Sequence, residues 1–268
     1  TRTLCCPCRQ LKGIQGWILN QILYKLRVSP ACMGFIKGSG IKRNAQMHVG
    51  SVAMLSLDLE DYFGSISVER VFALFRKIGY SNAVSSLFAK LCTYNNCLPQ
   101  GSPCSPMLAN LISWGMDVRL IAYTARRGIV YTRYADDLTF SSNIPRVLGE
   151  SKDTIIRIIE DEKFKINCEK SRMAGPARAR IATGLVVSME DVGIGKSKYK
   201  ILRSKIYNVA SAGTEPSEFA LNHINGWMAY LKDVDERRYR KMIGYIKKLI
   251  VQEDACCLNV LLRSEAEE

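Results

Sequence analysis

Apolar residues recur at helical spacing near the start of the chain and alternate with polar residues further on. Residues 8–27 carry an apolar residue at every third or fourth position, which predicts a first helix. Residues 34–50 are rich in glycine and basic residues, which predicts a loop or a short strand. Residues 52–59 have the apolar and β-branched character of a strand, which the Gly64-Ser65 pair then interrupts.

Capping residues mark the elements that follow. Ser67 and Ser81 each precede apolar residues at helical spacing, which predicts two short helices. Ser105-Pro106 predicts the start of another helix, because proline suits the first helical turn. Aromatic and β-branched residues in 128–142 then predict a hairpin.

The second half of the chain changes from mixed structure to basic helices. The pattern predicts a helix near 151–163, β-like stretches at 164–173 and 180–189, and basic helices near 197–210, 216–232 and 235–252. This order of elements is typical of an α+β core with a helical appendage at its C-terminal side.

Composition narrows the class of partner. The chain is 47% hydrophobic and 24% charged, which argues against wholesale disorder, and no apolar run approaches the roughly 20 residues of a membrane helix. The formal charge of +13 indicates a polyanionic partner, of which nucleic acid is the commonest. The ten cysteines accompany no secretion signal, and a chain of this length folds without disulfides, so a reducing cytoplasm is expected.

Three acidic residues are expected to meet at one end of the predicted sheet. Asp58 ends the predicted strand, with Leu57 and Leu59 pointing to the opposite face, and Asp136-Asp137 form the tip of the hairpin. Like charges held this close repel one another, and removing them from water costs more still. Two Mg²⁺ ions about 4 Å apart would neutralise the cluster and join it to substrate phosphates. Asp58 and Asp136 are therefore predicted to bridge the metals, with Asp137 accessory; the alternative is a pair of surface acids in a turn.

Several motifs together resemble the palm of reverse transcriptases. They are DLEDYF at 58–63, LPQGSPCSP at 98–106 and YADD at 134–137. Two more are similar to elements of the bacterial retron type: NAQMH at 44–48 resembles the NAxxH element, and ATGL at 182–185 resembles the VTG element with alanine in its first position. The resemblance runs from about residue 2 to about residue 250.

The resemblance implies a right-hand polymerase with an antiparallel palm sheet, a catalytic hairpin and a helical thumb. On this interpretation residues 1–50 are partial fingers and 51–190 are the palm, with an inserted helical fingers segment at about 67–99. Residues 191–268 would then be the thumb.

The same resemblance implies roles for individual residues. Asp58, Asp136 and Asp137 would be catalytic and would bind the metal. Phe63 would lie beneath the incoming sugar and exclude a 2′-OH, Gln100 and Gly101 would lie near the nascent base pair, Lys170 beside the leaving pyrophosphate, and Arg2 near the triphosphate. Each role has an alternative without function: Phe63 would be a core residue, Gln100 and Gly101 part of an ordinary loop before a helix, and Lys170 a solvated surface residue.

A further set of residues is expected to bind nucleic acid. It comprises Arg9, Asn44, His48, Thr183, Gly184, Lys196, Lys200, Arg203 and Tyr207. The last four form a basic stripe with one aromatic on a predicted helix, which suits a duplex backbone but equally suits a solvated face. His48 is either a residue that holds RNA or one that shapes the junction of fingers and palm, and a hydrogen-bonded histidine beside the core is the alternative.

The resemblance implies an RNA-directed DNA polymerase that uses dNTPs and two Mg²⁺ ions in the bacterial cytoplasm, away from membranes. It also implies a cognate structured non-coding RNA as template and primer, a guanosine 2′-OH start, a branched RNA–DNA product (msDNA), and a role in anti-phage defence beside an effector protein. A host ribonuclease H would remove the template. Two alternatives stay open: a ribonucleoprotein scaffold that restrains a toxic partner, and a group II intron or diversity-generating reverse transcriptase, against which the NAxxH and TG elements argue.

Overall fold

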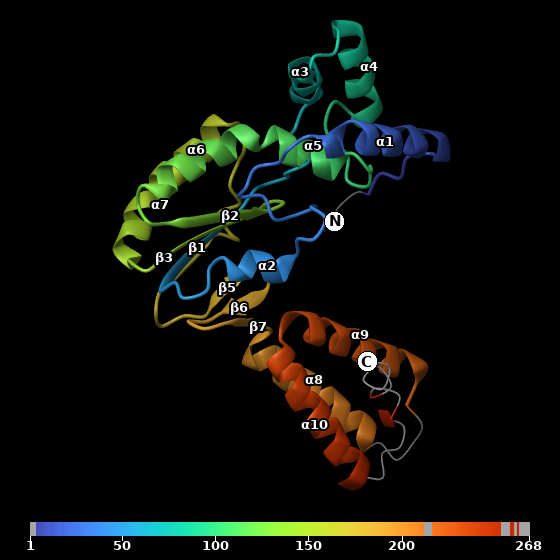
Figure 1. Ribbon diagram of the computed structural model, residues 1–268, viewed down its shortest axis with the longest axis vertical. Helices are drawn as coiled ribbons and strands as arrows, with labels where there is room; N and C mark the ends of the chain where they lie inside the picture. Colours follow the sequence, from blue (N-terminus) through green and yellow to red (C-terminus); the bar gives the residue numbers. More distant parts are fainter. Residues whose placement is uncertain (1–3, 212–215, 253–257, 260–261, 263–268) are drawn as a thin grey trace.

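A four-stranded antiparallel sheet lies at the centre of the molecule, with strand order β2-β3-β1-β4 (Figure 1). The computed structural model describes residues 4–211, 216–252, 258, 259 and 262. The strands are β1 (Ala53–Asp58), β2 (Val130–Tyr134), β3 (Asp137–Ser142) and β4 (Arg172–Ala174). The predicted strand at 52–59 and the predicted hairpin are therefore confirmed.

Alternation along β1 separates a buried face from a functional face. Leu55 and Leu57 enter the main hydrophobic core, which also receives Leu120 and Ile155 from two helices that cover this side of the sheet. These helices are α6 (Trp114–Ala125) and α7 (Pro145–Asp161), and they lie together across one face in Figure 1. Each fully buried apolar side chain stabilises the fold by about 1.5–3 kcal/mol. Asp58 consequently points away from these helices.

A second group of helices lies at the upper right of Figure 1. They are α1 (Arg9–Gln21), the short 3-10 helix η1 (Leu23–Lys25), α3 (Val68–Ile78), α4 (Asn82–Cys92) and α5 (Ser105–Ile112). Ser67 and Ser81 occupy the predicted N-cap positions of α3 and α4, but of the two only Ser81 forms a side-chain cap, its hydroxyl accepting a hydrogen bond from the Val84 N–H at 3.3 Å. Helix α3 ends at the predicted Gly79, with φ of 114°.

A second hydrophobic core joins a small sheet to the C-terminal helices. The sheet has the order β5-β6-β7, with β5 (Arg180–Ala182), β6 (Leu185–Val187) and β7 (Val192–Gly193). The helices are α8 (Gly195–Ala210), α9 (Glu218–Val234) and α10 (Glu236–Gln252), which confirms the three predicted basic helices. Leu185, Leu202 and Leu231 share this core with Met54 of β1, so it is continuous with the central sheet.

Four segments differ from the sequence-based expectation. A helix, α2 (Ile41–Gln46), forms where a loop or short strand is predicted, and α6 is absent from the prediction. Helix α7 begins at Pro145 rather than near residue 151, again with proline in the first turn. Residues 164–171 turn instead of forming a strand, with the Ser171 hydroxyl bonded to the Asn167 carbonyl. Within residues 4–211 and 216–252, no helix has the length and apolar character needed to cross a bilayer.

Candidate active site

The ends of β1 and β3 bring the three predicted acids together. These strands pair antiparallel with Asp58 directly opposite Asp137, and Asp136 lies in the two-residue loop between β2 and β3. The Leu59 N–H donates to the Asp136 carbonyl at 3.0 Å, which fixes this loop against the end of β1. Directly opposite residues of an antiparallel pair have Cβ atoms about 4.5–5.5 Å apart, so the expected proximity of Asp58 to the hairpin tip is confirmed.

A pocket of about 420 Å³ opens at this point. Asp58 and Asp136 line it together with Phe63, Gln100 and Lys170, all of which the sequence singled out. Asp137 is exposed at the adjacent end of β3. The structure thus gathers residues from well separated segments of the chain around Asp58 and Asp136.

Neighbouring negative charges make Asp137 harder to ionise. The pKa of Asp137 is raised to about 6, first by partial removal from water and then by the negative charges of Asp136 and Asp58, while the positive charge of Lys170 acts in the opposite direction. The Lys170 ammonium donates to both carboxylate oxygens of Asp58, at 3.1 and 3.3 Å. A cation at this position is therefore favourable, because it relieves repulsion that the fold imposes.

The donor set fits magnesium in the manner typical of phosphate-transferring sites. Among the described residues, no three carboxylate, imidazole or thiol groups lie close enough to enclose a metal ion on their own. Mg²⁺ prefers oxygen ligands and usually takes only one or two protein carboxylates, with waters and substrate phosphates completing its shell. Asp58 and Asp136 offer such carboxylates at the wall of this open pocket.

The predicted sugar gate lies among aromatic rings. Phe63 is half-buried, and its ring centroid lies 5.4 Å from that of Tyr62 and 6.3 Å from that of Phe35. Phe35 also lines the pocket and has φ of 59°, in the left-handed region that few non-glycine residues adopt. The sequence analysis missed Phe35, and its only signal was the neighbouring glycine in a glycine-rich segment.

Gly101 lies against the N-terminal segment of the protein, whereas the sequence predicted that nucleic acid would approach it. Its φ is 112°, and a Cβ at this position would lie 2.4 Å from the carbonyl oxygen of Cys5. The Cys5 N–H in turn donates to the Gln100 carbonyl at 2.8 Å. Glycine is required here because a side chain would collide with the backbone of Cys5. Gln100 remains at the pocket.

The two retron-like elements contact each other rather than the pocket. The Asn44 amide donates to the Thr183 hydroxyl at 3.4 Å, and that hydroxyl donates to the Ile41 carbonyl at 3.3 Å. Thr183 and Gly184 have φ of 47° and 81°, which shapes the turn between β5 and β6. Asn44 is fully buried, so its side chain supports the protein, contrary to its predicted contact with nucleic acid. Gly184 is exposed.

His48 is likewise buried, at 1% exposure, under the central sheet. Its two ring nitrogens lie 2.7 Å from the hydroxyls of Ser141 on β3 and Thr132 on β2. The structure therefore differs from a direct RNA contact and agrees with the other interpretation, a residue that shapes the junction beside the catalytic hairpin.

This placement gives a pH prediction. Burial lowers the pKa of His48 to about 4, from the ordinary 6.5, so the folded protein keeps the ring neutral while the unfolded chain takes up a proton. Titration of His48 therefore leaves the free energy of unfolding unaffected above pH 6.5. This free energy decreases as the pH falls from 6.5 towards 4, by at most about 1.4 kcal/mol per pH unit. Denaturant unfolding of the wild type and His48→Gln across this range should give curves of different slope. Parallel curves would contradict the assignment.

The predicted basic stripe lies on the solvent side of α8. Lys196, Lys200, Arg203 and Tyr207 are exposed, while Leu202 and Ile206 are buried in the second core. The Arg203 guanidinium lies 4.2 Å from the ring centroid of Tyr245 on α10, so the stripe extends across two helices. Arg9 is exposed at the start of α1, and Arg2 lies outside the described residues.

Comparison with known proteins agrees with this geometry. The family model described as reverse transcriptase (RNA-dependent DNA polymerase) matches residues 1–206. The retron Ec86 reverse transcriptase of Escherichia coli is 43% identical over 248 residues, which are 92% of this chain and 76% of that protein. The retron Mx65 reverse transcriptase of Myxococcus xanthus is 33% identical over 90% of this chain and 60% of its own length. Telomerase from Candida tropicalis, solved with a TWJ fragment of telomeric RNA, aligns over 90% of this chain and 47% of its own, with a TM-score of 0.51 and 12% identity.

Proposed function

This chain belongs to the reverse transcriptase family, with retron reverse transcriptases as relatives, and on that premise we propose that Asp58 and Asp136 form its catalytic metal site. The family assignment confirms the RNA-directed DNA polymerase activity and the right-hand polymerase fold expected from the sequence motifs. The observation that carries the site proposal is the pairing of Asp58 with Asp137 beside Asp136, in a pocket open to substrate.

Each pocket residue has a task in this proposal. Asp58 and Asp136 hold two Mg²⁺ ions, with Asp137 accessory. Magnesium there would lower the pKa of the attacking hydroxyl and stabilise the departing pyrophosphate. Lys170 supplies a positive charge beside the leaving group, which its place against Asp58 supports. Phe63 limits the space below the sugar, so that deoxynucleotides are preferred.

The template is proposed to be a structured non-coding RNA that also supplies the primer. The identity with two retron reverse transcriptases supports this proposal. Synthesis would begin at a guanosine 2′-OH and yield a branched RNA–DNA molecule in the bacterial cytoplasm. A host ribonuclease H would then remove the copied template. An effector protein would act beside this polymerase in anti-phage defence.

The exposed stripe on α8 is proposed to follow the backbone of the template–product duplex. Lys196, Lys200 and Arg203 are exposed cations on one side of the helix, with the exposed ring of Tyr207 beside them. Affinity that depends on phosphate contacts falls with salt, by a slope of about 0.9 per neutralised phosphate in a log–log plot for B-form duplexes. Gly184 and Arg9 are further exposed candidates.

Sequencing the nucleic acid that copurifies with the protein tests the retron proposal. We expect one RNA of defined sequence joined through a 2′–5′ branch to complementary DNA. The matched control is the Asp136→Asn, Asp137→Asn double variant, which should retain the RNA and lack the DNA. Recovery of unbranched DNA from many templates would contradict a retron function and favour another reverse transcriptase class.

Gly34 gives a prediction for the catalytic loop. A Cβ at Gly34 would lie 2.7 Å from the backbone nitrogen of Ala135, so Gly34→Ala should displace the loop that carries Asp136. We expect primer extension to slow by roughly 10- to 100-fold, since a shift of about 1 Å at reacting groups has this cost. Gly40→Ala is the control, because nothing lies within 4 Å of its Cβ. Equal rates for the two variants would refute the steric account.

A further inference from the structure

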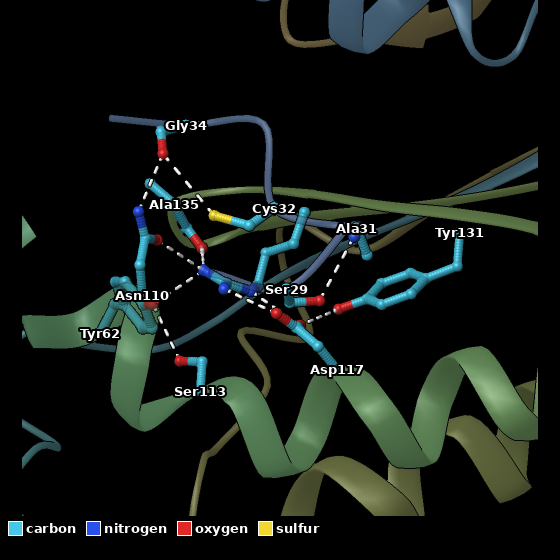
Figure 2. A network of polar contacts seen from close by, with 11 residues as sticks. Ser29, Ala31, Cys32, Gly34, Tyr62, Asn110, Ser113, Asp117, Tyr131 and Ala135 are labelled. Carbon is cyan, nitrogen blue, oxygen red and sulfur yellow. Dashed lines mark hydrogen bonds and ion pairs between the residues drawn. The ribbon is translucent and has the colours of Figure 1, made fainter. Parts of the chain in front are cut away.

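A buried ion pair joins strand β2 of the catalytic hairpin to helix α6, and Figure 2 shows the polar contacts around it. Arg133 of β2 donates from Nη2 to Asp117 Oδ2 at 2.8 Å and from Nε to Asp117 Oδ1 at 2.9 Å. Both side chains are completely buried. A bidentate pair of this kind holds the guanidinium in one orientation, and this directs the remaining nitrogen, Nη1, toward the active site.

Nη1 contacts two of the segments that build the pocket. It donates to the Tyr62 hydroxyl oxygen at 2.9 Å and to the Ala135 carbonyl at 3.3 Å. Tyr62 immediately precedes the gate residue Phe63, and its ring lies against it. Ala135 immediately precedes Asp136 and has φ of 56°, so its carbonyl lies in a loop that the backbone alone does not favour.

The same nitrogen is also connected, through Asn110, to the segment that carries Phe35. Nη1 also donates to Asn110 Oδ1 at 3.1 Å, and Asn110 Nδ2 donates to the Gly34 carbonyl at 2.9 Å. Gly34 immediately precedes Phe35, whose ring lies beside Phe63 in the pocket. Figure 2 shows Asn110 between the Gly34 carbonyl and the ion pair.

Stability by itself does not explain this arrangement. A buried ion pair is often matched or exceeded in stability by apolar side chains of similar volume, because removing two charges from water is costly. Through hydrogen bonds, this ion pair instead connects Tyr62 before the gate residue, the catalytic loop at Ala135, and Gly34 before Phe35. These contacts fix the relative positions of the three segments. Fully satisfied buried networks of this kind make a local structure rigid and unique.

We propose that the Arg133–Asp117 pair positions the aromatic wall of the nucleotide pocket, and that the Tyr62 hydroxyl is thereby a determinant of sugar selection. The proposal rests on the role of Phe63 as sugar gate. Tyr62 is a positioning residue here, since its hydroxyl is buried against Arg133 and Ser113 and acts through Phe63.

Two chemically identical substitutions test this proposal. Tyr62→Phe removes the hydroxyl on the gate side of the ion pair. Tyr131→Phe removes a buried hydroxyl on the far side, which donates to Asp117 Oδ1 at 2.8 Å and contacts no pocket residue through that group. The readout is the ratio of kcat/KM for dGTP to kcat/KM for GTP in primer extension. This ratio does not depend on the fraction of folded enzyme.

We expect Tyr62→Phe to lower the ratio by about tenfold, within the range that misplacement by less than about 1 Å causes, and Tyr131→Phe to leave it unchanged. Phe63→Ala distinguishes the role of Phe63 as sugar gate from the role of Tyr62 in positioning it. If Phe63→Ala lowers the ratio and Tyr62→Phe does not, the positioning role is wrong and the gate stands. If Phe63→Ala leaves the ratio unchanged, the gate is wrong and the positioning role falls with it. Equal decreases for both tyrosine variants would indicate a general structural effect and overturn the proposal.

Discussion

Replacing Asp136 by asparagine is expected to abolish measurable nucleotide addition while leaving the protein folded. Asparagine keeps the size of the side chain and removes the charge that would hold the metal. Loss of several kcal/mol of metal-based stabilisation corresponds to roughly a 1,000-fold decrease in kcat. The unfolding temperature should stay equal or rise, because Asp136 raises the pKa of Asp137 and thus repels it in the folded state. Single-nucleotide extension and thermal unfolding measure the two effects.

Glu60→Gln provides the matched control, since Glu60 lines the same pocket and is exposed. It removes the same charge from the same rim and should retain most of the activity. If both variants lose activity equally, the pocket needs negative charge in general, and the assignment of Asp136 as a metal ligand is wrong. The Asp136 variant also separates polymerase from scaffold, because a pure scaffold would keep its function without making DNA.

Replacing Arg133 by methionine is expected to destabilise the protein by about 3–5 kcal/mol. Methionine has similar length but leaves the Asp117 carboxylate buried and unpaired, and an isolated buried charge has this cost. Urea unfolding measures the change in the free energy of unfolding. Arg119→Met on α6 is the control: Arg119 is exposed and its ion pairs with Asp161 and Glu162 lie at the protein surface, so little change is expected.

A double variant checks the cause of this loss. Arg133→Met combined with Asp117→Leu removes both charges and should recover most of the stability, because no unpaired charge remains. It should not recover sugar selection, since the contact with the Tyr62 hydroxyl stays broken. A double variant as unstable as the single one would show that packing, rather than the buried charge, explains the loss.

The sequence correctly predicted those elements that a single local pattern determines, such as alternation of apolar residues or a capping serine. Alternation in β1 predicted Leu57 on the core side and Asp58 on the opposite side. Leu57 is buried in the main core and Asp58 lines the pocket, which confirms this. The serine before α4 forms its predicted cap. Helix α2 was missed because six residues are too few to show a helical period, and it forms through contacts with β2 and the small sheet.

Buried polar partners could not be predicted in the same way. Arg133 occupies a core-facing position of β2, and its partner Asp117 comes from α6, a helix absent from the prediction. Only the three-dimensional fold brings the two together. Motif resemblance predicted that Asn44 and His48 bind nucleic acid, with a role in shaping the junction of fingers and palm as the other interpretation of His48. The structure shows both side chains buried and hydrogen-bonded within the protein, which the motifs alone did not indicate.

Counting Mn²⁺ ions by electron paramagnetic resonance tests the central claim most directly. The sample is the enzyme with its RNA template, a primer ending in a 3′-deoxy nucleotide, and a dNTP. The account predicts two bound Mn²⁺ ions in the wild type, with at least one lost in Asp58→Asn and in Asp136→Asn. Two ions retained at unchanged affinity in both variants would contradict the assignment of these carboxylates as the metal site.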